Sequence, residues 1–112
     1  MKNYIKSDGS ATVEIGVGVE LFKEGDYMVA YCSALEVSSF GNNEVQAREN
    51  FEEALDIFIE ETIKRGTLEK VLLDLGWSLR KKPTARYTPP KHQIKYPESG
   101  QHSFEERVLL PI

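Results

Sequence analysis

Residues 11–22 alternate between apolar side chains and polar residues or glycine, which is the pattern of a β-strand with one buried face. The apolar positions are Val13, Ile15, Val17, Val19 and Leu21. In the turn at residues 23–26, Gly25 can adopt the positive φ that short connections need, and residues 27–32 follow as a second strand. The pattern therefore predicts a β-hairpin. The apolar residues Leu35, Val37 and Phe40 indicate a short third strand.

Residues 41–65 carry apolar side chains at the spacing of one helix face. The members of this face are Ala47, Phe51, Ala54, Leu55, Phe58 and Thr62. Asn43 is a good N-cap, and Gln46 lies three residues later, where its side chain can reach back to the cap amide. Gly66 follows Arg65 and tolerates the left-handed conformation that ends many helices. We expect a long amphipathic helix here.

Residues 67–75 predict a second, short helix that stops at Gly76, and residues 77–79 predict a fourth strand. The expected order is β-β-β-α-(α)-β, an α+β fold in which a helix layer packs on one sheet as a two-layer sandwich. We assign this domain to residues 1–82. Pro83 then opens a proline-containing, basic segment, residues 83–112, for which we expect an irregular tail. Its apolar end predicts a strand that adds to a sheet edge or swaps onto another copy.

Length and composition fit a single soluble domain without a leader or a membrane helix, so we expect a cytoplasmic protein. The net charge of −4 is unevenly distributed. Residues 1–79 hold 7 Lys or Arg and 15 Asp or Glu, which gives −8, whereas residues 80–112 hold 7 and 3, which gives +4. An acidic body favours a basic macromolecular partner, or the basic segment of a second copy. An uneven surface charge that only keeps the protein soluble is the alternative.

Two motifs together resemble the HicB antitoxin family of bacterial toxin–antitoxin systems over about residues 13–79. The first is the hairpin motif Gly25-Asp26-Tyr27-Met28-Val29-Ala30-Tyr31-Cys32. The second is Leu35, then Gly41-Asn42-Asn43, then a helix with Ala47, Asn50, Glu53, Ala54 and Leu55. The resemblance implies a partial RNase H-like fold that covers a small, basic, RNA-cleaving toxin of the HicA type.

The chain departs from that family in two places. The loop at residues 33–41 lacks the Pro-x-Leu-x-Gly-Cys motif that is usual in the family. No segment after Pro83 has the periodicity of a ribbon-helix-helix or helix-turn-helix domain. DNA binding is therefore not carried over from the resemblance. A homo-oligomeric regulatory or structural protein without a toxin partner stays open as an alternative.

The residue pattern argues against an enzyme, a metal site or a bound cofactor. Glu14 and Glu20 share one strand face but lie about 20 Å apart along it, too far to hold a metal pair. His92 and His102 do not have a zinc spacing, and Cys32 at a strand end is most simply a small buried residue. We expect a buried Trp77 as well.

The candidate sites are therefore partner-binding surfaces. Helix carboxylates on the side opposite the apolar face would complement a basic partner: Glu49, Glu52, Glu53, Asp56 and Glu60. The apolar end of the chain would bind along a sheet edge: Val108, Leu109, Leu110 and Ile112. A homodimer or higher oligomer could form through the same end. A lesser alternative is nucleic-acid binding by the basic run Arg80-Lys81-Lys82 and by Arg86, Lys91 and Lys95, interleaved with Tyr87 and Tyr96.

Overall fold

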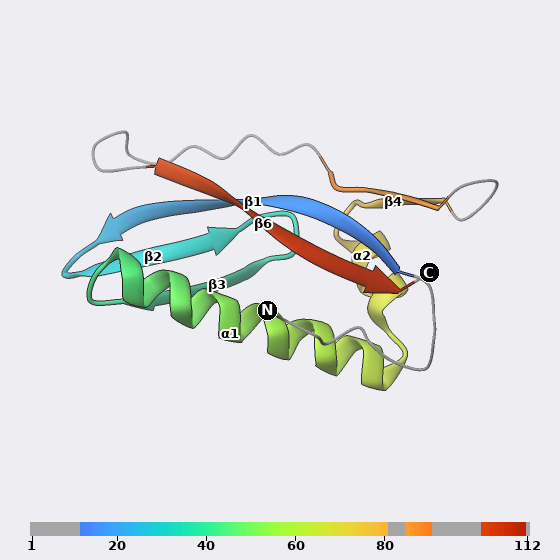
Figure 1. Ribbon diagram of the computed structural model, residues 1–112, viewed down its shortest axis with the longest axis horizontal. Coiled ribbons are helices and arrows are strands. Elements are labelled where there is room, and N and C mark those ends of the chain that lie inside the picture. Colours follow the sequence, from blue (N-terminus) through green and yellow to red (C-terminus); the bar gives the residue numbers. More distant parts are fainter. Residues whose placement is uncertain (1–11, 81–84, 91–101, 112) are drawn as a thin grey trace.

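The computed structural model describes residues 12–80, 85–90 and 102–111 as an α+β fold with two helices (Figure 1). The elements are β1 (Thr12–Glu24), β2 (Tyr27–Cys32), β3 (Val37–Gly41), α1 (Glu44–Arg65), α2 (Leu68–Asp74), β4 (Ser78–Arg80), β5 (Arg86–Thr88) and β6 (His102–Pro111). The main sheet has the order β3-β2-β1-β6, and β4 pairs with β5 in a separate two-stranded sheet. Both predicted helices and the predicted hairpin are present.

The long strand β1 organises the main sheet because it pairs with a neighbour on each side. Its second half pairs antiparallel with β2, from Glu20 opposite Tyr31 to Glu24 opposite Tyr27. Almost its whole length pairs antiparallel with β6, from Thr12 opposite Pro111 to Leu21 opposite His102. The hairpin between β1 and β2 turns at Gly25, whose φ of 62° confirms the predicted left-handed turn residue.

One face of this sheet packs against α1, and the core lies between the two layers (Figure 1). The sheet contributes the alternating positions that the sequence predicts: Val17, Val19 and Leu21 of β1 are buried, while Val13 and Ile15 pack at its margin. The helix contributes Ala47, Phe51, Leu55, Ile59 and Thr62 as its buried face. Ile59 follows the same 3.6-residue spacing as the other buried residues, so the helical period should have placed it on the predicted apolar face.

The ends of α1 follow the predicted caps with one change. The Oδ1 of Asn43 accepts from the Gln46 backbone N–H at 2.8 Å, and Gly66 ends the helix with φ of 70°. The Gln46 side chain reaches back as expected, but its Oε1 accepts from the N–H of Asn42 at 2.7 Å, one residue before the cap. The sequence Gly41-Asn42 brings this earlier amide within reach by turning sharply into the helix.

The fourth strand of the main sheet differs from the prediction. Residues 77–79 were expected to supply it, but β4 pairs with β5 instead, with Leu79 opposite Tyr87. The position beside β1 is taken by β6, at the apolar end of the otherwise irregular segment, where a strand adding to a sheet edge or swapping onto another copy was predicted. The reason is apolar burial: β6 brings Val108 and Leu110 to the core face, whereas β4 is three residues long and exposes Ser78 and Arg80.

The small sheet still belongs to the same core. Trp77 is buried as expected, and its Nε1 donates to the Ala34 carbonyl at 2.8 Å. The Tyr87 ring is also buried, and its hydroxyl donates to the Pro111 carbonyl of β6 at 3.0 Å. The buried indole and phenol thus satisfy their polar atoms with backbone acceptors. No helix among the described residues is long and apolar enough to span a membrane.

Replacing Phe51 with alanine should destabilise the fold strongly. Phe51 is fully buried and meets Phe104 of β6 edge-to-face, with ring centroids 6.4 Å apart, so the variant leaves a cavity between the layers. We expect the free energy of unfolding to fall by about 3–5 kcal/mol in urea titrations. Ile57→Ala, on the exposed side of α1, is the matched control and should change it by less than about 0.5 kcal/mol. Equal losses in the two variants would contradict this two-layer packing.

Candidate protein-binding surfaces

The predicted acidic residues of α1 form one continuous stripe on the side of the helix away from the sheet. Their spacing of three, four and seven residues keeps all five carboxylates within about a quarter of the helix circumference. Glu49, Glu52, Glu53 and Glu60 are exposed, whereas Asp56 is half-buried. We call these five residues the acidic stripe.

Two ion pairs of α1 lie beside the acidic stripe. Arg48 pairs with Glu44 at 3.1 Å, and Arg65 pairs with Glu61 at 3.4 Å. Arg48 also lies with its guanidinium 4.1 Å from the centre of the Phe104 ring, which holds it over β6. Arg48 and Arg65 of α1 thus contact groups outside the acidic stripe.

The predicted edge-binding residues of the C-terminal segment lie mainly inside the molecule. Val108 and Leu110 are 1% and 0% exposed and belong to the core, and Leu109 is half-buried on the other side of β6. Ile112 lies outside the described residues. The apolar character of this segment is therefore accounted for by packing within the chain, and β6 presents no exposed apolar row to a partner in this conformation.

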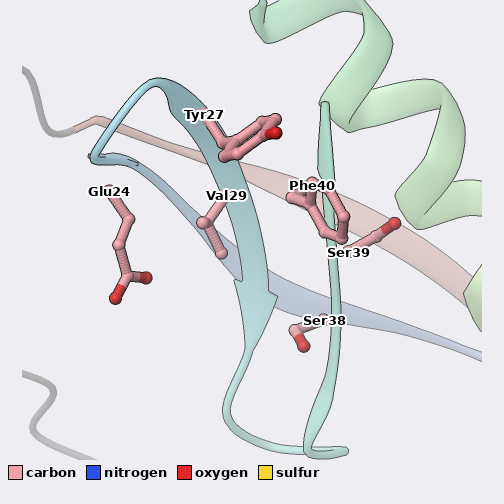
Figure 2. Close-up of a pocket in the computed structure, with 6 residues that line it drawn as sticks. All are labelled: Glu24, Tyr27, Val29, Ser38, Ser39 and Phe40. Carbon is pink, nitrogen blue, oxygen red and sulfur yellow. The ribbon is translucent and has the colours of Figure 1, made fainter. Parts of the chain in front are cut away.

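The sheet face away from α1 carries a hollow of about 610 Å³ (Figure 2). It is lined by Glu24, Tyr27, Val29, Ser38, Ser39 and Phe40, from the three strands β1, β2 and β3. Tyr27 and Phe40 meet edge-to-face, with ring centroids 5.3 Å apart and an angle of 74° between the rings. We call this concavity the aromatic hollow.

Sequence reasoning missed the aromatic hollow, although a signal for it was present. Val37 and Phe40 were both assigned to the third strand by their apolar character. Residues three apart on a strand point to opposite faces, so only one of them can meet the core. In the structure Val37 is buried and Phe40 is 58% exposed.

The basic run proposed as a nucleic-acid platform is only partly described. Arg80 and Arg86 lie opposite each other in the β4–β5 pair, and both are exposed. Tyr87, however, is 2% exposed, so its ring has no free face on which a base could stack. Lys81, Lys82, Lys91, Lys95 and Tyr96 lie outside the described residues.

Cys32 lies in the core, where burial raises the pKa of its thiol. A thiol acts as a nucleophile through its thiolate, which this environment disfavours. Burial, followed by the nearby Glu36 and Cys32 charges, also raises the pKa of Tyr31. Among the described residues, no group of three or more His, Cys, Asp or Glu is arranged to hold a metal ion. His92 lies outside the described residues.

Raising the pH through the alkaline range should lower stability partly through Cys32. The unfolded chain ionises its thiol near the ordinary pKa of about 8.5, while the folded state keeps it protonated to higher pH. The contribution is fully present below the unfolded pKa and is lost as pH rises toward the folded value. We expect the free energy of unfolding, from urea titrations, to fall less between pH 7.5 and 9.5 in Cys32→Ala than in the wild type. Parallel pH dependences would show that the thiol makes no such contribution.

Comparison with family models, with curated proteins and with solved structures finds no match for this chain.

Proposed function

We propose that this protein is a binding module, without catalytic activity, that recognises a basic partner protein through the acidic stripe. The observation that supports the proposal is the arrangement of five carboxylates, four of them on exposed residues, along one side of a helix whose other side is buried in the core. Acidic helix faces also occur without a partner. Here, the Arg48–Glu44 and Arg65–Glu61 ion pairs that flank the acidic stripe involve none of its five carboxylates.

The rigidity of α1 makes the acidic stripe a suitable recognition surface. Phe51, Leu55 and Ile59 are fully buried, so the backbone that carries the carboxylates is fixed before any partner arrives. A preorganised surface loses little conformational entropy on binding. Charge of one sign along a fixed line also speeds the approach of an oppositely charged protein, and salt screens that attraction.

The specific form of this proposal is an antitoxin-like role, in which the module covers a small basic toxin of the HicA type. Two features support it. The hairpin motif and the capped-helix motif resemble those of HicB antitoxins, and residues 1–79 are acidic. The α+β fold with a helix on one sheet face is compatible with it. Masking a partner requires tight association rather than chemistry, which agrees with a surface of carboxylates on a rigid frame.

Co-expression with the neighbouring gene is the first test of this role. If that gene encodes a small basic protein whose expression arrests growth, the present chain should restore growth. Purified together, the two proteins should form a complex whose affinity falls as the salt concentration rises. A toxic basic neighbour that the chain neither binds nor neutralises would overturn the antitoxin role.

Charge reversal on the acidic stripe should weaken that complex. We expect the triple variant Glu49→Lys, Glu53→Lys and Glu60→Lys to lower the affinity about 100-fold, from about 1 kcal/mol for each exposed charge, measured by titration calorimetry.

The control variant, Glu61→Lys with Glu69→Lys and Asp74→Lys, changes the net charge equally but lies outside the acidic stripe. It should retain affinity to within a few-fold. Equal weakening by both triple variants would show that net charge, and not this surface, governs binding.

A further inference from the structure

The aromatic hollow lies on the sheet face opposite the one that α1 covers, so it is separate from the acidic stripe. On β2, Tyr27 and Val29 alternate with the buried Ala30 and Cys32, and Phe40 on β3 pairs with Val29. We propose that the aromatic hollow is a second binding site, which takes an arginine side chain from a basic peptide segment. This inference uses none of the residues on which the proposed function depends.

The hollow offers aromatic surface that the fold itself does not use. Tyr27 is 48% exposed and Phe40 58%, although both are large and apolar, and Val29 lines the hollow beside them (Figure 2). Their edge-to-face contact fixes the two rings relative to each other, so neither needs to be ordered on binding. A guanidinium stacks favourably on such a ring and is attracted by its negative face.

The charges around the hollow select a cation. Glu24 lines it opposite Tyr27, and on the same sheet face the register places Glu20 opposite Tyr31, four residue pairs away along β1 and β2. The remaining outward positions of this part of the sheet are Phe22, Tyr27, Val29, Tyr31, Ser38 and Phe40. This region of the described sheet therefore has two carboxylates and no Lys or Arg among its outward residues.

Arg107, a cation that the described residues place on the same sheet face, lies on the far strand. Its Nε is 4.0 Å from Glu14 and its Nη1 is 3.9 Å from Glu105, so it is attracted to carboxylates outside the hollow. Among the described residues, the outward positions around Glu24 therefore carry no cation to complement its carboxylate. A face-to-face pairing of two such hollows would instead bring Glu20 and Glu24 of both copies together, which electrostatic repulsion disfavours.

The strand edge beside the hollow is blocked at the point where a peptide would need to add. The Nδ2 of Asn50 donates to the Phe40 carbonyl at 2.8 Å, and this occupies an acceptor that an added strand would use. The helix approaches so closely at Gly41 that a Cβ there would lie 2.7 Å from the Ala47 nitrogen. Recognition at this place is therefore by insertion of a side chain, and not by extension of the sheet.

Arginine suits the hollow better than lysine for two geometric reasons. Its flat guanidinium can stack on the Phe40 or Tyr27 ring, and its charge is attracted by the Glu24 carboxylate that lines the same hollow. Its aliphatic stem can lie along Val29, as long cationic side chains do on apolar surface. The volume, about 610 Å³, also has room for the residues that flank the arginine in a peptide.

The test uses the full chain, labelled with ¹⁵N, and the probe N-acetyl-arginine amide. We expect saturable shifts of the Tyr27, Val29 and Phe40 amides. Phe40→Ala and Glu24→Gln should each weaken binding by about twofold to fivefold, the effect of a cation–π contact or charge pair at an exposed site. The isosteric but uncharged probe N-acetyl-citrulline amide should bind more weakly by a similar factor.

Two control variants separate this site from the acidic stripe. Ile57→Ala removes an exposed apolar side chain from α1, and Glu49→Gln removes a carboxylate from the acidic stripe; both should leave the shifts unchanged. Phe40 is exposed, so Phe40→Ala should keep the wild-type circular dichroism spectrum, and Glu24→Gln provides an independent variant. Loss of partner binding by the stripe variants would leave these results intact.

Three outcomes would overturn the inference. Equal binding of the citrulline probe would show an apolar site that does not select a cation. Shifts confined to α1 would show that the probe binds the acidic stripe alone. Self-association that Phe40→Ala abolishes, seen by light scattering without any probe, would make a second copy of the chain the occupant.

Discussion

The contact between the apolar side of α1 and the alternating apolar side of β1 is the interaction on which the rest of this structure depends. Val17, Val19 and Leu21 on the strand and Phe51, Leu55 and Ile59 on the helix are all buried. Neither element could bury its apolar side alone, because a single amphipathic helix or hairpin is marginal in water. Joined, they fix which side of each element must face solvent. The acidic stripe and the aromatic hollow are the two surfaces left over by this arrangement.

A two-layer fold exposes the outer side of both layers, and in this protein both outer sides carry carboxylates. On the helix they are regularly spaced and unaccompanied by aromatic rings, which suits long-range attraction more than shape recognition. On the sheet, Glu24 is accompanied by two fixed rings within a concavity, which suits the recognition of one particular side chain. The two surfaces differ in what they can distinguish, although both favour basic ligands.

The sequence was sufficient for those parts of the fold whose signal is local. The alternation through Val13 and Leu21, the cap at Asn43 and the glycine at position 66 each involve residues near one another in the chain, and the structure has all of them. The main-sheet position of β6 was not predictable in this way, because the register that joins Ile15 to Val108 has no local signature. Pro83 and the prolines that follow it suggested an irregular segment, and the apolar end beyond them predicted a strand without indicating which strand it pairs with.

The candidate surfaces show the same division. The acidic stripe could be predicted from the helical period alone, since its carboxylates recur within a single element. The aromatic hollow needs residues from three strands in register, and it becomes visible only when Val29 is known to lie opposite both Phe22 and Phe40. Periodicity locates the exposed side of one element, whereas a concavity depends on how several elements are aligned.

The pairing of β1 with β6 has a consequence for the order in which the protein can be assembled. As the ribosome extends the chain, β1, β2, β3 and α1 emerge well before residues 102–111, so the growing product carries an open strand edge beside an incompletely covered core. Unpaired edges of this kind are where nascent chains associate wrongly. Closure of the sheet must therefore wait for a late-synthesised segment, which makes its rate, and the chaperones present during that interval, decisive for the yield of native protein.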